Sequence, residues 1–81
     1  MENKVAHEVT RMRIMIQLEQ WRNSIEDLRI QNIVAQSLGD NEEQRKPIHA
    51  QMERCVRAVE KLESMLAELN AEQAKDVAPT P

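Results

Sequence analysis

The residues that most readily interrupt helices, glycine and proline, are confined to a few positions of this chain: Gly39, Pro47, Pro79 and Pro81. Residues 3–38 contain neither, and the same holds for residues 48–78. Residues that favour helices are abundant, whereas Trp21 is the only aromatic residue and β-strands favour aromatic side chains. The sequence therefore predicts an all-α fold built from two long helices.

The break between the helices lies around Gly39, which follows Leu38 where a left-handed helix cap is expected. Asp40 and Asn41 suit a turn or an N-cap, and Pro47 suits the first turn of the next helix. We predict one helical hairpin over residues 1–75, with a helix over about 3–38, a turn over 39–46 and a helix over about 47–73. Residues 76–81 are expected to form a flexible tail.

Each predicted helix carries an apolar seam with alternating steps of three and four residues, the spacing of antiparallel coiled-coil-like packing. In the second helix the seam consists of Ile48, Met52, Cys55, Val59, Leu62, Leu66 and Leu69. In the first it consists of Ile14, Leu18, Trp21, Ile25, Leu28, Asn32 and Ala35. The two seams predict an antiparallel two-helix hairpin.

The first helix also has apolar residues away from this seam. They are candidate interface residues, together with Trp21: Val5, Val9, Met12, Ile16, Ile30, Ile33 and Val34. A single stripe that drifts through Met12, Met15, Leu18 and Trp21 is an alternative arrangement. Either way, this helix presents more apolar surface than one neighbouring helix covers, which favours a protein-interaction function.

Length leads to the same expectation. A core in a chain of 81 residues rarely contributes more than about 3–5 kcal/mol, and the single cysteine excludes an internal disulfide. The predicted boundaries also leave the first helix overhanging the second by up to about ten residues, or roughly 15 Å. We therefore expect a partner, either another protein or a second copy in a dimeric four-helix bundle or larger assembly.

Catalytic and metal-binding motifs are not recognisable. The helical zinc motif that His7 and Glu8 begin has Arg11 in place of its second histidine, and His49 and Cys55 lie on different faces of one helix. Cys55 lies on the second seam and is expected to be a buried thiol, with a disulfide-linked dimer contact as the alternative. We predict a non-enzymatic protein with no metal, cofactor or small-molecule substrate; a small helical enzyme is the second alternative function.

The first alternative function is a dimeric nucleic-acid-binding regulator, because Arg11, Arg13, Arg22 and Arg29 lie on the first helix. Interleaved acidic residues and a formal net charge of −3 favour salt-bridged, solvated faces instead. No stretch has the roughly 20 apolar residues of a membrane span. We expect a cytoplasmic protein that acts as an adaptor, assembly factor or structural subunit.

Two seam residues have alternative roles. Trp21 is expected to fill the hairpin core or to anchor an intermolecular contact, since tryptophan is enriched at such anchors. Asn32 either fixes the register of the helices or is solvated near the turn.

Overall fold

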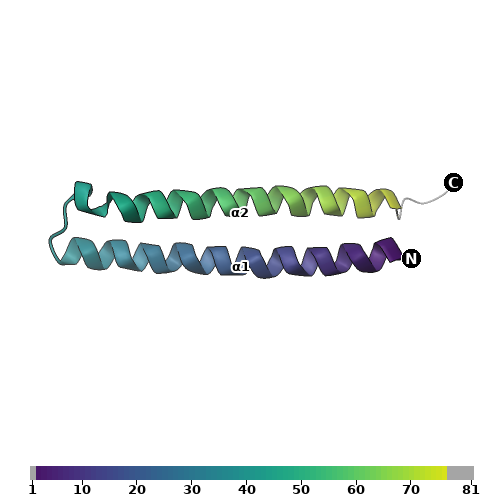
Figure 1. The fold of residues 1–81 in the computed structure, drawn as a ribbon, viewed down its shortest axis with the longest axis horizontal. Coiled ribbons are helices and arrows are strands. Elements are labelled where there is room, and N and C mark those ends of the chain that lie inside the picture. The colour runs from purple at the N-terminus through teal and green to yellow at the C-terminus, as the bar shows by residue number, and fades with distance from the viewer. Residues whose placement is uncertain (1, 77–81) are drawn as a thin grey trace.

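The computed structural model contains two helices, α1 (Glu2–Ser37) and α2 (Glu42–Asp76), which pack against each other as an antiparallel hairpin. It describes the backbone of residues 2–76 and the side chains of residues 6–74. The start of α1 and the end of α2 lie at one end of the hairpin, and the connection between the helices lies at the other end (Figure 1). The predicted all-α hairpin is confirmed, whereas residues 77–81 of the expected tail lie outside the described part.

The end of α1 is determined by Gly39, whose φ of +94° lies in the left-handed region that favours glycine. The amide of Asp40 donates to the carbonyl of Ala35 at 3.0 Å, and the amide of Gly39 donates to the carbonyl of Gln36 at 3.1 Å. These two bonds form a Schellman motif, which satisfies carbonyls that the helix end would otherwise leave without donors. The cap predicted at Gly39 is therefore present.

The start of α2 differs from the prediction, because the helix begins at Glu42 rather than near Pro47. Asn41 and Gln44 form a reciprocal capping box. The Gln44 amide donates to Asn41 Oδ1 at 2.9 Å, and the Asn41 amide donates to Gln44 Oε1 at 2.8 Å. Pro47 is the sixth residue of α2 and lies in its second turn, where the missing amide leaves the carbonyl of Glu43 without its helical donor.

This early start makes the expected overhang of the first helix wrong. The connection is shorter than predicted, and α2 continues to Asp76 because no proline or glycine follows before Pro79. The helices contain 36 and 35 residues. His7 Nε2 of α1 lies 3.8 Å from Glu72 Oε2 of α2, so the two helices remain side by side almost to the end opposite the connection.

The core follows the two predicted seams. Every seam residue from Ile14 to Ala35 and from Ile48 to Leu69 is buried or half-buried. Ile14, Leu18 and Leu62 form the central cluster, against which four half-buried residues pack: Trp21, Val59, Leu66 and Leu69. The principal extents of the molecule are 65 × 17 × 14 Å, so the core is thin and solvent is never far from it.

Candidate protein-interaction surface

Two groups of exposed apolar side chains lie on the outer face of α1, the face directed away from α2. The first patch consists of Val9, Met12 and Ile16, and the second patch consists of Ile30, Ile33 and Val34. These six side chains are between 45% and 62% exposed. Helical geometry explains their position, since they fall between the core positions of the repeat, on the far side of the helix.

A polar segment separates the two patches. The steps of three and four that connect Val9, Met12 and Ile16 continue through Glu19, Asn23 and Glu26 before reaching Ile30. Ile30 lies fourteen positions after Ile16, or about 21 Å along the helix at 1.5 Å per residue. The apolar surface of α1 is therefore two patches along one line, with hydrophilic side chains between them.

The remaining candidate interface residues have different environments. The side chain of Val5 lies outside the described residues. Trp21 is half-buried and packs against the Ile14–Leu18–Leu62 cluster, which supports its role in the hairpin core. The indole also lines an open groove with Ser24 and Leu28 of α1 and with Cys55 of α2.

The residues of the alternative drifting stripe do not share one environment. Met12 and Met15 are 62% and 55% exposed, whereas Leu18 is 5% exposed and Trp21 is half-buried. The stripe therefore runs from the exposed surface of α1 to the face that packs on α2. Met15 and Leu38, which were not predicted as interface residues, are also exposed apolar side chains.

A polar cluster at the connected end of the hairpin involves Asn32. Its Oδ1 accepts a hydrogen bond from an Arg45 guanidinium nitrogen at 3.1 Å and lies 3.1 Å from His49 Nε2. Arg45 Nε also donates to the Asp40 carbonyl at 3.3 Å. Asn32 is thus bonded to α2 rather than solvated alone, which supports its register role. A role for Arg45 was not predicted from the sequence. Its position, three residues before Ile48, is the one at which the α2 seam would continue towards the turn.

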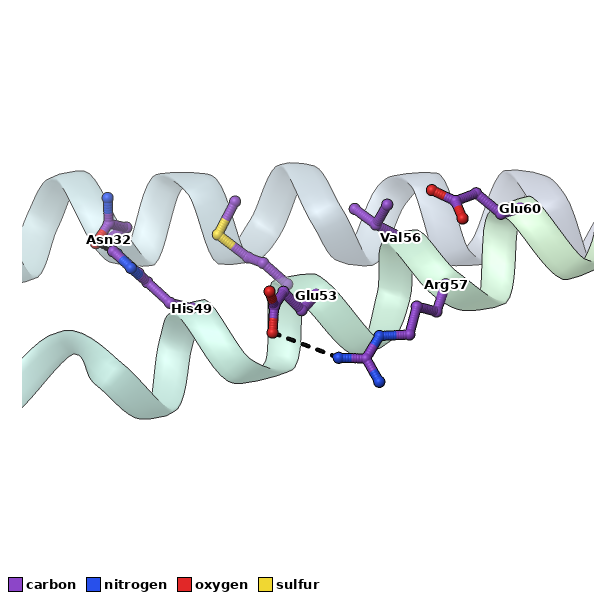
Figure 2. A pocket seen from close by; sticks show the side chains of 7 residues that line it. Asn32, His49, Glu53, Val56, Arg57 and Glu60 are labelled. Carbon is purple, nitrogen blue, oxygen red and sulfur yellow. Dashed lines mark hydrogen bonds and ion pairs between the residues drawn. The ribbon is translucent and has the colours of Figure 1, made fainter.

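Figure 2 shows an open groove that begins at this cluster and follows α2. Besides Asn32, its lining comes from α2: His49, Met52, Glu53, Val56, Arg57 and Glu60. Arg57 lies 3.5 Å from Glu53 Oε2, so the two opposite charges in the groove pair with each other. Both side chains are largely exposed, and a surface pair of this kind contributes little to stability. Met52 and Val56 are the apolar residues of this lining, and the other five are polar or charged.

Three of the four α1 arginines on which the nucleic-acid alternative was based are paired with carboxylates. Arg11 lies 3.8 Å from Glu8, Arg29 lies 3.1 Å from Glu26, and Arg22 lies 3.2 Å from Glu63 of α2. Arg13 is exposed and, among the side chains of residues 6–74, forms no ion pair.

Metal ligands do not converge in the part of the chain that the structure describes, where no group of three or more His, Cys, Asp or Glu side chains is found. Cys55 is a free thiol that is 5% exposed on the α2 seam, as expected for a small apolar core residue. Neither α1 nor α2, over the residues described, contains a segment long and apolar enough to cross a membrane.

Comparison with known proteins leaves the surface to be interpreted from its own geometry. No protein-family model matches the chain, and neither the curated proteins nor the solved structures that were compared contain a match.

Proposed function

We propose that this chain is a non-enzymatic protein-interaction module that acts by burying the two patches of α1 against another polypeptide, as an adaptor, assembly factor or structural subunit. The observation that supports this proposal most strongly is the exposure of both patches on a face that α2 leaves uncovered. Contiguous apolar surface on a small protein commonly marks an interaction site. A cytoplasmic location is part of the proposal.

The size of the patches indicates that both are needed for binding. Burying a fully exposed aliphatic side chain contributes about 1.5–3 kcal/mol, so a half-exposed one has roughly 1 kcal/mol left to contribute. One patch of three residues therefore offers about 3 kcal/mol, which is below the roughly 4–15 kcal/mol lost in association. Two patches covered on both partners of a symmetric dimer would offer about 12 kcal/mol, which reaches that range.

The outer face of α2 differs from that of α1 in chemistry. Between the positions of its seam it presents charged and small residues, among them Glu53, Arg57, Glu60, Lys61 and Ala67. Val56 and Met65 of α2 are each 41% exposed. Both are next to a seam position, so they lie at the edge of the contact with α1 and not on the outer face of α2. The proposed binding surface is consequently on α1 alone.

The proposal is tested by comparing the parent with a variant in which Val9→Glu and Ile33→Glu disrupt one residue of each patch. A matched control carries Ser64→Glu and Ala67→Glu on the outer face of α2, which adds the same two negative charges at exposed positions. A photo-reactive amino acid at position 12 records which polypeptide, including another copy of the chain, covers α1. The proposal predicts cross-linked products in host extract that are lost in the patch variant and kept in the control.

Circular dichroism of the same variants provides the folding control, because the patch residues contribute little to the hairpin core. Cross-linking that is equal in the parent and the patch variant would contradict the proposal, as would an absence of any product from the parent.

A further inference from the structure

We propose that the outer face of α1 binds the outer face of α1 in a second copy of the chain, with the two α1 helices antiparallel. This inference rests on the proposed function and identifies its partner. The four helices of the dimer then lie in the order α2–α1–α1–α2, with both α1 helices in the centre.

The spacing of the outer face is the first argument. Its residues repeat in steps of three and four along nearly the whole of α1: Val9, Met12, Ile16, Glu19, Asn23, Glu26, Ile30, Ile33 and Ser37. Five of these nine positions are apolar and they lie towards the two ends, as in a coiled-coil seam whose centre is polar. A helix that packs on this face and follows the same repeat can contact both patches at once.

The arrangement of the patches is self-complementary when one helix is reversed. In antiparallel packing, Val9 lies opposite Ile33 of the second copy, and Met12 lies opposite Ile30 of the second copy. The two-fold axis repeats each pair at the other end, as an isologous interface requires. Two residues of each patch are then covered by two residues of the other patch, whereas Ile16 and Val34 lie outside these apolar pairs.

The polar segment between the patches pairs in the same register. Glu19 lies opposite Asn23 of the second copy, so a carboxylate faces an amide that can donate to it. Polar layers of this kind lower affinity and fix the register and orientation of packed helices. Glu26 lies opposite Ile16 of the second copy; Arg29 of its own helix, 3.1 Å away, holds the carboxylate, and the Glu26 methylene groups face the isoleucine.

The charges in this seam and at its edge favour the antiparallel orientation of the two α1 helices. Arg13 and Asp27 are both exposed, and the structure records no ion pair for either within its described residues. In the antiparallel register Arg13 lies beside Asp27 of the second copy, and the two-fold axis forms this pair twice. A parallel dimer would instead place Glu19 opposite Glu19 and Glu26 opposite Glu26 of the second copy within the seam itself, and like charges across an interface disfavour association.

Chemical cross-linking tests the orientation in a Cys55→Ser background, with a short bis-maleimide reagent on the full chain. Gln20 lies near the proposed two-fold axis, so Gln20→Cys alone should give a covalent dimer. Val9→Cys alone should give little product, whereas Val9→Cys combined with Ile33→Cys should give a dimer efficiently. Efficient cross-linking of Val9→Cys alone would show that the helices are parallel and would overturn the proposal.

Charge exchange tests the register. Arg13→Asp and Asp27→Arg should each weaken dimerisation about tenfold, because each change replaces two attractive pairs with two repulsive ones. The double variant restores both pairs with reversed sign and should return the dissociation constant to within about threefold of the parent. Analytical ultracentrifugation measures these constants. A double variant as weak as the single variants would overturn the register.

The mass of the parent protein separates this inference from the proposed function. A monomer up to high micromolar concentration that still gives patch-dependent cross-links to a different polypeptide would refute the dimer and leave the interaction function standing. A monomer that gives no patch-dependent cross-link at all would refute both.

Discussion

The contrast between Ile14 and Ile16 provides a sharp test of which face of α1 belongs to the hairpin. The two residues are of the same type, lie on the same helix and are two positions apart, yet they are 5% and 55% exposed. Replacing each in turn with alanine removes the same atoms from opposite faces. The two variants are therefore controls for each other.

Ile14→Ala should lower the free energy of unfolding by about 2–3 kcal/mol, near the lower end of the range for buried aliphatic residues. The lower end is expected because Ile14 packs with Leu18 and Leu62 in a thin core that can partly collapse around the lost volume. For Ile16→Ala, at most about 1 kcal/mol of packing is lost. The higher helix propensity of alanine offsets up to about 0.7 kcal/mol of this, so the net change in the isolated hairpin should be within about 0.5 kcal/mol.

Urea unfolding followed by circular dichroism, repeated at a low and a high protein concentration, measures both effects. Ile14→Ala should destabilise the protein at every concentration. Ile16→Ala should match the parent when dilute and fall below it when concentrated, because only the associated form buries Ile16. Equal destabilisation by the two variants in dilute solution would refute the assignment of Ile16 to the outer face.

Three further changes test the fold. Gly39→Ala should cost about 1–2 kcal/mol, measured by thermal melting, because alanine is strained at a φ of +94° and no atom lies within 4 Å of the added Cβ to compensate. Asn41→Ala removes one half of the capping box and should cost about 0.5–2 kcal/mol in the same assay; an unchanged melt would exclude the cap. Leu62→Asp places an unpaired charge in the central cluster and should abolish the helical circular dichroism signal, so a parental melt would show that the core is misassigned.

The two seams could be predicted from the sequence because the buried positions of two packed helices recur every three or four residues. Leu18 and Leu62 stand at positions where the steps of three and four place one stripe of each helix against the other, and both are buried. Gly39 was equally readable, since a single glycine after a long helical segment is the usual left-handed cap.

The start of α2 was mispredicted because two local signals compete there. Pro47 favours a helix that begins near residue 47. Asn41 and Gln44 have the spacing of a capping box, which favours a helix that begins near residue 42. The structure shows that the capping box prevails, since each of its two hydrogen bonds satisfies an amide at the start of the helix. The predicted overhang failed for the same reason.

The candidate interaction surface illustrates what periodicity leaves open. An apolar residue such as Ile33 has the same sequence pattern whether its cover comes from its own chain or from another one. The structure removes one possibility by showing that α2 occupies the opposite face of α1 and leaves Ile33 57% exposed. The identity of the cover therefore has to be argued from charge and symmetry, as for Arg13 and Asp27.

The compositions of the two faces of α1 imply that they differ in the strength of their contacts. At mid-helix the inner seam continues with Leu18, Trp21 and Ile25, so apolar contact with α2 is unbroken. The outer seam has Glu19 and Asn23 at the same level, and these lose hydration when covered. A surface whose apolar contacts lie at its ends and whose centre must be desolvated should bind more weakly, and with more dependence on orientation, than a continuous apolar seam.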